Sequence, residues 1–228
     1  MTPRVVRDPR PGAPDSVIAI GSFDGVHRGH RTLLDRVVRE AREIGAEPAV
    51  LTFEPLPREL LMPDAAPPRL SALGTKLAAF ADAGIVTAYV CRFTRAFASL
   101  TAAEFAARLR THHGARRVLV GRDFRFGAKR AGDVTVLADE GRRHGYAVEV
   151  QATVDDGAER VSSTRVRAAL AAGDLDLAAR LLGRPFTVCG RVVHGRKLGR
   201  SLGFPTANVQ LPPGRPAMTG VFAVRCLG

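Results

Sequence analysis

The sequence has 228 residues, of which 46% are hydrophobic and 25% are charged. These fractions are typical of globular proteins and exclude a disordered chain, and the lack of an apolar run of about 18 residues excludes a membrane helix. Lysine and arginine outnumber aspartate and glutamate by 34 to 22, so the net charge is +12. Such a charge suits a nucleic-acid binder or a protein that handles phosphorylated small molecules. Because the arginines are spread along the chain, we expect no nucleic-acid partner and no membrane partner.

The cysteines and the amino terminus bear on location. Cys91, Cys189 and Cys226 are odd in number and lack Cys-x-x-Cys spacing, so we expect reduced thiols rather than disulfides or a zinc site. No signal-peptide stretch opens the sequence. We therefore expect a cytoplasmic protein, and the sequence indicates no oligomeric state.

Short apolar or β-branched runs alternate with helical patterns through the first two thirds of the chain. Strands are predicted at residues 17–20, 48–53, 88–91, 117–120 and 147–150. Apolar residues at helical spacing predict helices over residues 33–44 and 101–112, which Gly45 and Gly114 would end. This alternation predicts an α/β fold with a doubly wound, Rossmann-like parallel sheet.

Two stretches fall outside this pattern. Residues 55–68 are rich in proline and are expected to form a surface connection. Residues 186–193 have strand-like composition with no helical pattern behind them, and glycine and proline become frequent afterwards. We therefore divide the chain into a first domain, residues 1–183, and a β-rich second unit, residues 184–228, which is near the lower limit for an independent core.

The turn at residues 21–30 reads Gly-Ser-Phe-Asp-Gly-Val-His-Arg-Gly-His. It joins a predicted strand to a predicted helix, so backbone N–H groups are free to face an anion such as a triphosphate. His27 and His30 are three residues apart and would project on one side of a first helical turn, where both can donate to phosphate oxygens. Gly29 would keep the space between them open. A tight turn with two surface histidines is the simpler alternative, but it does not require this many special residues.

Two later segments carry groups suited to the same chemistry. Residues 161–167, Val-Ser-Ser-Thr-Arg-Val-Arg, precede an apolar helical run, so Ser162 or Ser163 would cap a helix whose N–H groups can meet a phosphate. Arg167 would add a positive charge. Residues 120–127 follow the fourth predicted strand, at the edge of the sheet where ligands usually bind, and contain an aspartate and two phenylalanines.

The turn and these segments resemble the His-x-Gly-His nucleotidylyltransferases. In particular they resemble the FMN adenylyltransferase module of bacterial bifunctional riboflavin kinase/FAD synthetases. Residues 161–167 are similar to that family's Ile-Ser-Ser-Thr-x-x-Arg signature, with Val161 in place of isoleucine. Residues 52–58, Thr-Phe-Glu-Pro-Leu-Pro-Arg, resemble a further family segment but carry Leu56 where the family usually has histidine.

The resemblance implies a reaction in which ATP and FMN give FAD and pyrophosphate, with Mg²⁺ bridging phosphate oxygens. It also implies three sets of site residues. The catalytic residues would be His27, His30 and Arg167, and the ATP-binding residues would be Gly21, Ser22, Phe23, Asp24, Gly25, Gly29, Ser163 and Thr164. The flavin-binding residues would be Asp123, Phe124, Phe126 and Gly127.

Residues 195–208 are glycine-rich and basic and can wrap a polyphosphate, with Thr206 and Asn208 as oxygen ligands of Mg²⁺. A basic surface hairpin is the alternative. The segment resembles the riboflavin kinase signature, and residues 221–224 resemble a following strand, so the second unit is expected to be an incomplete β-barrel-type module. The family's later strands and catalytic glutamate would lie beyond Gly228, and riboflavin kinase activity is therefore not expected here.

Two other functions stay open at this point. Another nucleotidylyltransferase would use the same turn with a different phosphorylated acceptor, because the turn itself does not recognise the acceptor. A non-catalytic protein that binds nucleotide, flavin or nucleic acid would account for the net charge and for Leu56. Steeply salt-dependent duplex binding without turnover would distinguish that protein.

Overall fold

The computed structural model describes residues 2–195, 203–204, 206–211 and 215–226. Its centre is a six-stranded sheet in the order β1-β4-β3-β2-β5-β6, in which every neighbouring pair is parallel. The strands are β1 (Arg4–Val6), β2 (Ser16–Ile20), β3 (Glu47–Glu54), β4 (Thr87–Arg92), β5 (Ala115–Gly121) and β6 (Ala147–Gln151). The fold is therefore α/β with a Rossmann-like sheet, as predicted.

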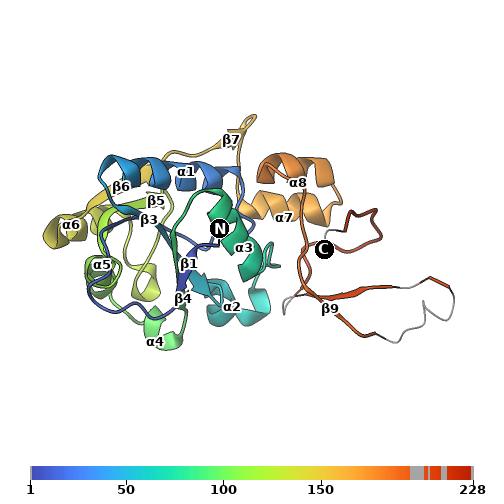
Figure 1. Cartoon of the computed structure of the whole chain (residues 1–228), viewed down its shortest axis with the longest axis horizontal. Coiled ribbons are helices and arrows are strands. Elements are labelled where there is room, and N and C mark those ends of the chain that lie inside the picture. The colour runs from blue at the N-terminus through green and yellow to red at the C-terminus, as the bar shows by residue number, and fades with distance from the viewer. Residues whose placement is uncertain (1, 196–202, 205, 212–214, 227–228) are drawn as a thin grey trace.

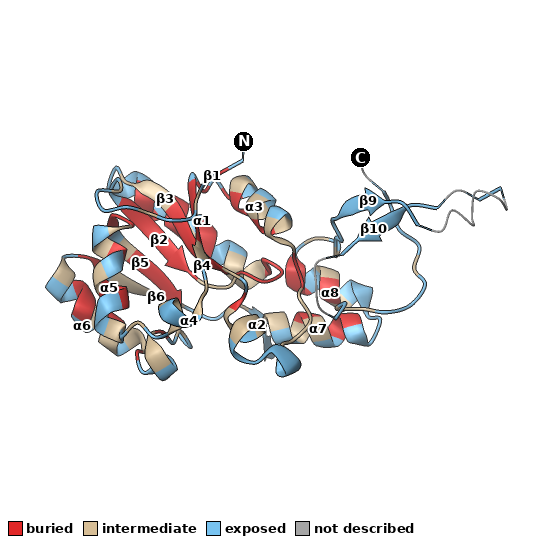
Figure 2. Ribbon diagram, turned by 90° about the horizontal axis from the view of Figure 1, so that it is seen from below, coloured by how far each residue is buried: buried red, intermediate tan, exposed pale blue. Residues whose placement is uncertain are grey.

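Helices cover both faces of this sheet (Figure 1). The covering helices are α1 (Arg28–Glu43), α3 (Leu73–Asp82), α5 (Ala102–Thr111) and α6 (Val134–His144). Alternate residues of a strand point to opposite faces, so Val17 packs with Leu34 of α1 and Phe80 of α3 on one face. Ile18 packs with the α5 and α6 side on the other face. Figure 2 shows the strands as a buried layer between the helices.

The chain order of the strands determines where a ligand can bind. From β2 the chain moves outward to β3 and β4, and it later returns to place β5 and β6 on the opposite side of β2. The strand order therefore reverses between β2 and β5, and in doubly wound sheets ligands bind outside the carboxyl ends of the strands at such a point. The turn after β2 and the segment after β5 both leave the sheet at this position.

A third group of elements follows β6. A short hairpin, β7 (Asp155–Asp156) with β8 (Glu159–Arg160), precedes α7 (Ser163–Ala171) and α8 (Leu175–Leu182). The two helices share a hydrophobic cluster that includes Leu70 from the loop before α3. Ser162 accepts a hydrogen bond from the Arg165 N–H at 3.2 Å, so it is the one of the two candidate serines that caps α7.

Most predicted elements are present, with shifted ends. All five predicted strands form, and β1 adds a sixth that the sequence analysis missed. The proline-rich residues 55–68 form the short helix α2 (Pro57–Leu61) and a 3-10 turn (Pro63–Ala65). Two further short helical segments, α4 (Arg95–Ala98) and a 3-10 turn (Ala128–Arg130), complete the first 183 residues.

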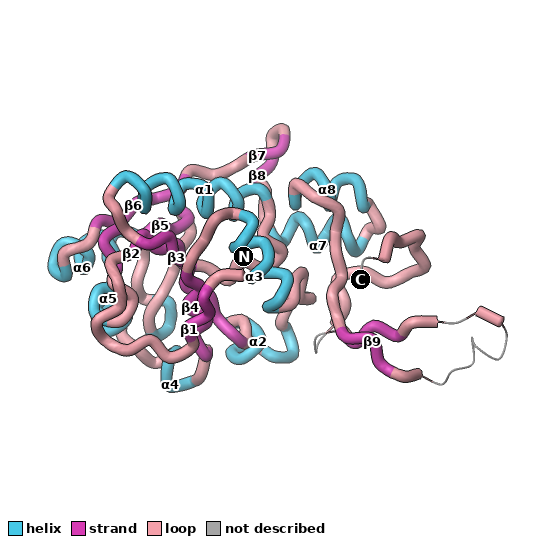
Figure 3. Tube along the Cα trace, viewed as in Figure 1, coloured by secondary structure: helices cyan, strands magenta, loops and turns pink. Residues whose placement is uncertain are grey.

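The β-rich expectation for residues 184–228 is only partly correct. One hairpin forms, from β9 (Arg191–Val193) and β10 (Asn208–Gln210), and all six of its residues are exposed. The strand expected at residues 221–224 is wrong, because these residues are not in a strand. Figure 3 shows the other described residues of this segment as loop, and the described residues contain no closed barrel. A strand needs a paired neighbour, and no described strand pairs with residues 221–224.

Candidate active site at the carboxyl ends of the strands

The turn between β2 and α1 is held in a strained backbone conformation. Phe23, Gly25 and Val26 have positive φ angles of 49°, 85° and 41°, which L side chains rarely adopt and which persist only when the surroundings stabilise them. The Gly21 N–H donates to the carbonyl of Leu51 at 3.1 Å, which ties the turn to β3. The Ser22 carbonyl accepts from the Thr52 hydroxyl at 3.3 Å and adds a second tie.

Three residues of this turn act through shape. The Phe23 ring is buried between His30 and Phe80, at centroid distances of 5.2 and 5.3 Å, so only its backbone borders the turn. A Cβ on Gly25 would lie 2.9 Å from the Leu70 side chain, and the φ angle there already favours glycine. A Cβ on Gly29 would lie 3.3 Å from the His27 ring. Gly29 therefore leaves room for this histidine.

His27 and His30 lie face to face at the start of α1. Their ring centroids are 3.7 Å apart and their planes differ by 16°. The Nδ1 of His27 accepts a hydrogen bond from the His30 N–H at 3.3 Å and caps the helix. An Nδ1 that accepts must be unprotonated in the neutral ring, so the proton of His27 resides on Nε2, which is then a donor.

Both imidazoles are neutral near pH 7. Burial, together with the positive charges of Arg160 and Arg184, lowers the pKa of His27 to about 4. Burial also holds the pKa of His30 well below its usual value, with His27, Arg160 and Lys76 contributing. The histidines can therefore donate neutral hydrogen bonds to phosphate oxygens, while positive charge at the site comes from arginine and lysine side chains.

Asp24 anchors the loop before α3. Its carboxylate is 3% exposed and accepts hydrogen bonds from the N–H groups of Leu70 and Ser71 at 3.0 Å. The guanidinium of Arg167 donates to the same carboxylate at 2.6 Å. These donors occupy the Asp24 oxygens, so its contribution to nucleotide binding would be to shape the site.

Residues 161–167 meet the first turn at Asp24. The Ser163 hydroxyl donates to the Asp24 carbonyl at 2.8 Å, and Arg167 donates through Nε to the Pro68 carbonyl at 2.6 Å. Thr164 is exposed in the first turn of α7. The structure thus brings together the two segments that the sequence analysis paired, with Arg167 held by protein groups.

Arg160 is a candidate that the sequence analysis missed. It forms an ion pair with Asp123, one of the residues expected to bind flavin, and its charge lowers the pKa of both His27 and His30. The Asp123 side chain is 65% exposed and its pKa is lowered, chiefly by the hydrogen bond from Arg160. Arg160 therefore pairs with the segment after β5 and acts electrostatically on both histidines. Its position directly before Val161 was the available sequence signal.

The segment after β5 offers one accessible ring. Phe124 is half-buried and stacks on Phe126 at 5.5 Å, whereas Phe126 is buried and also contacts Phe105 at 5.4 Å. Gly127 has φ 73°, and a Cβ there would lie 2.9 Å from the Ala102 nitrogen. Phe126 and Gly127 therefore fix the loop, while Phe124 and Asp123 present groups toward solvent.

Residues 52–58 are held by buried charge. Lys76 of α3 is fully buried, with its Nζ 2.7 Å from a Glu54 oxygen. Arg69 forms ion pairs with both Glu54 and Glu59. Burial alone would lower the pKa of Arg69, but the two carboxylates outweigh it and the pKa is raised. Leu56 is buried and precedes α2. The family's usual histidine is therefore replaced here by a buried apolar side chain, Leu56.

The expected metal ligands of the second unit are exposed and adjoin the part of the chain that the structure does not describe. Residues 196–202 and 205 of the glycine-rich segment lie outside the described residues, while Thr206 and Asn208 are exposed. In the part of the chain that the structure describes, no group of three or more His, Cys, Asp or Glu residues can hold a metal ion. With Asp24 and Asp123 paired to arginines, a Mg²⁺ ion at the first site would take its ligands from the nucleotide.

The parallel sheet, the strand reversal and the histidine turn define an α/β nucleotide-binding protein. Comparison with known proteins identifies its kind. Residues 10–165 match the family model for FAD synthetase, and residues 182–228 match the model for riboflavin kinase. The chain belongs to the family of bifunctional riboflavin kinase/FMN adenylyltransferases and has domains of both activities.

Two relatives support this placement, and one solved structure has a similar fold. The bifunctional riboflavin kinase/FMN adenylyltransferase of Pseudomonas fluorescens is 48% identical to this chain, and the match covers 94% of this chain and 69% of the relative. The enzyme of the same name from Escherichia coli K12 is 47% identical, and the match covers 93% of this chain and 68% of the relative. A crystal structure described as a macrolide-efflux protein from Streptococcus pneumoniae is 30% identical with a TM-score of 0.74, covering 94% of this chain and 71% of that one.

Among the described residues, no helix is both long and apolar enough to cross a membrane.

Proposed function

We propose that this chain transfers the adenylyl group of ATP to FMN at the turn of residues 21–30. An FMN phosphate oxygen attacks the α-phosphorus of ATP in line, the bond to the β-phosphate oxygen breaks, and pyrophosphate leaves. FMN phosphate is already an anionic nucleophile, so no covalent enzyme intermediate is needed. The protein contributes by positioning the reactants and stabilising charge on the phosphates.

His27 and His30 supply neutral donors to the α-phosphate, while Ser163, Thr164 and Arg167 face the polyphosphate from α7. The contact between Ser163 and Asp24 carries this proposal, because it places α7 beside the histidine turn although 139 residues separate the two. Both segments begin helices, and N–H groups at helix starts favour anions. Mg²⁺ bound to the nucleotide would neutralise part of the phosphate charge.

The flavin ring is assigned to the segment after β5. Phe124 supplies an apolar ring face, and Asp123 accepts hydrogen bonds from a ring edge or from ribityl hydroxyls. When flavin binds there, Arg160 would exchange its ion pair with Asp123 for contacts to phosphate. The ion pair between Asp123 and Arg160 supports this exchange, because Arg160 already lies at the segment proposed to bind flavin.

We further propose that residues 1–183 form the adenylyltransferase module and that residues 184–228 belong to the kinase module, with Thr206 and Asn208 as oxygen ligands of Mg²⁺ there. The small-molecule partners of the transferase are ATP and FMN, and riboflavin is the substrate that the kinase module of the family implies.

The test incubates the chain with FMN and MgATP and identifies the products. FAD and pyrophosphate in equal amounts are expected, and no FAD at micromolar enzyme would contradict the proposal. A parallel incubation with riboflavin and MgATP measures kinase activity separately. FMN formed there would contradict the expectation drawn from the sequence for the second unit.

A further inference from the structure

Arg184 contacts the histidine turn from the start of the second unit. It follows α8, and its guanidinium donates to the carbonyls of Gly25 at 2.8 Å and Val26 at 2.9 Å. A third, longer hydrogen bond reaches the Leu182 carbonyl at 3.3 Å. Within the described residues Arg184 forms no ion pair with a carboxylate, and burial lowers its pKa. A half-buried guanidinium that binds only carbonyl groups has a cost in solvation, which suggests a specific role.

The planarity of the peptide bond shows what these contacts do. In a trans peptide the C=O and the following N–H point in opposite directions. Because Arg184 holds the Val26 carbonyl on its own side, the His27 N–H of the same peptide is directed away from it. That N–H has no hydrogen-bond acceptor among the described residues. The carbonyl contacts thus aim a free backbone donor toward the side of the turn opposite Arg184.

The same contacts stabilise an unfavourable backbone. Gly25 and Val26 both have positive φ angles, and for a β-branched residue such as Val26 this conformation is an outlier. Strain of this kind persists at functional sites when neighbouring groups over-determine it. Arg184 binds the carbonyls of both residues with one planar fork, which the single ammonium of a lysine does not match.

We propose that Arg184 is a positioning residue for adenylyl transfer: it fixes the peptide planes of residues 25–27 so that the His27 N–H and the His27 ring face the phosphates. This inference rests on the proposed function of the turn. Arg184 touches no substrate and acts through His27. Its positive charge also contributes to the lowered pKa of His27.

The position of Arg184 in the chain gives the proposal a wider meaning. Arg184 lies within residues 182–228, which match the riboflavin kinase model, yet its contacts are to the transferase turn. The transferase site would therefore depend on a residue from the segment that matches the other activity. A cut between residues 183 and 184 would separate the turn from its support.

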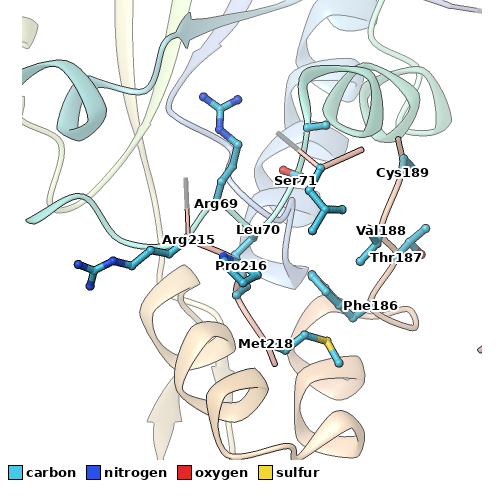
Figure 4. Close-up of a pocket in the computed structure, with 13 residues that line it drawn as sticks. Arg69, Leu70, Ser71, Phe186, Thr187, Val188, Cys189, Arg215, Pro216 and Met218 are labelled. Carbon is cyan, nitrogen blue, oxygen red and sulfur yellow. The ribbon is translucent and has the colours of Figure 1, made fainter. Parts of the chain in front are cut away.

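The neighbouring residues hold this segment in place. Phe186 packs against the cluster of α7, α8 and Leu70. Figure 4 shows Phe186, Thr187 and Val188 on one side of a small cavity and Leu70 and Ser71 on the other. The cavity has a volume of about 100 Å³. Leu70 and Ser71 are the residues whose N–H groups bind Asp24, so the loop before α3 contacts both the turn and the segment that follows Arg184.

The test compares Arg184→Gln and Arg184→Lys with the control Arg180→Gln. Arg180 is 61% exposed and its closest acidic contact is 3.9 Å away, so kcat of its variant should stay within about twofold of the unmodified chain. For Arg184→Gln we expect kcat of FAD formation to fall about a hundredfold, with KM for FMN nearly unchanged, because reactive groups are misplaced while flavin contacts remain. Arg184→Lys should lose less, since it keeps the charge but not the fork.

A chemical rescue separates positioning from loss of the fold. We expect millimolar guanidinium, but not ammonium, to restore part of the activity of Arg184→Ala. If Arg184→Gln fails to fold, Arg184→Lys carries the comparison. The inference would be overturned if Arg184→Gln or Arg184→Lys folds and keeps the kcat of the unmodified chain. In that case FAD formation by the unmodified chain would still uphold the proposed function. No FAD from the unmodified chain would instead contradict the function itself.

Discussion

Arg167 and the buried Asp24 form an ion pair, with the Arg167 Nη2 2.6 Å from the Asp24 Oδ2. The pair joins α7 to the turn after β2 across 143 residues of sequence. The same carboxylate binds the N–H groups of Leu70 and Ser71, so one side chain connects the turn, the loop before α3 and α7. Catalytic assembly and folding stability are therefore coupled at Asp24.

Asp24→Ala should destabilise the chain by about 3 to 5 kcal/mol, because removing one partner leaves the Arg167 charge without its carboxylate and two buried N–H groups without an acceptor. Urea unfolding measures the change. The matched control is Asp35→Ala, since Asp35 pairs with Arg31 at 2.8 Å but both side chains are exposed. That variant should change stability by less than about 1 kcal/mol. Equal effects of the two substitutions would contradict the anchoring role of Asp24.

Gly25→Ala should destabilise more than Gly45→Ala. Both glycines have positive φ, 85° and 64°, so both variants carry the backbone penalty of roughly 1 to 2 kcal/mol. Only at Gly25 would the new Cβ also meet a neighbour, at 2.9 Å from Leu70, whereas nothing lies within 4 Å at Gly45. The added crowding should cost about 1 to 3 kcal/mol more. Chemical denaturation checks this, and indistinguishable midpoints would show that Leu70 yields freely.

The free energy of unfolding should fall as the pH decreases from about 6.5 to 4. Burial lowers the pKa of both His27 and His113 from 6.5 to about 4. Between these values the unfolded chain binds more protons than the folded one, so acid favours unfolding. A shift of this size corresponds to roughly 3 kcal/mol for each histidine. Their contribution is complete above pH 6.5.

His113→Gln isolates one part of this pH dependence. His113 is buried away from the turn, beside Tyr89 and with its Nδ1 3.0 Å from the Arg108 carbonyl. Glutamine keeps a donor but does not titrate. The loss of stability from pH 7 to pH 4.5 should therefore be smaller in the variant, as followed by urea unfolding at each pH. An unchanged loss would mean that the folded chain protonates His113 readily.

The sequence predicted the parts of the fold that depend on local patterns. The apolar runs at the centres of β2 and β5 are buried, and the sequence shows them as apolar runs. The spacing of three residues between His27 and His30 places the two rings on one side of the helix start, where they stack. β1 was missed because it is a three-residue edge strand, none of whose residues is buried. Residues 221–224 have strand composition but no paired neighbour among the described strands.

The missing parts of the candidate site depend on contacts between distant segments. Arg184 binds backbone carbonyls 158 and 159 residues away, and a carbonyl leaves no trace in the side-chain pattern. Arg160 stands beside a recognised segment, but its pairing with Asp123 required the β7–β8 hairpin to be placed. The sequence named both aspartates of the site and Arg167, whereas Arg160 and the two aspartate–arginine pairings became known only from the fold.

The account depends most on the histidine pair. His30 lies beside His27, and its buried Nδ1 has no hydrogen-bond partner among the described residues. The direct measurement is the steady-state rate of FAD formation by His30→Ala, with His112→Ala as the control. Loss of a donor to the transition state costs about 2.7 to 4 kcal/mol. We expect kcat to fall a hundredfold or more for His30→Ala and to stay near that of the unmodified chain for His112→Ala. An unchanged kcat in a folded His30→Ala would contradict the assignment of this turn as the site of adenylyl transfer.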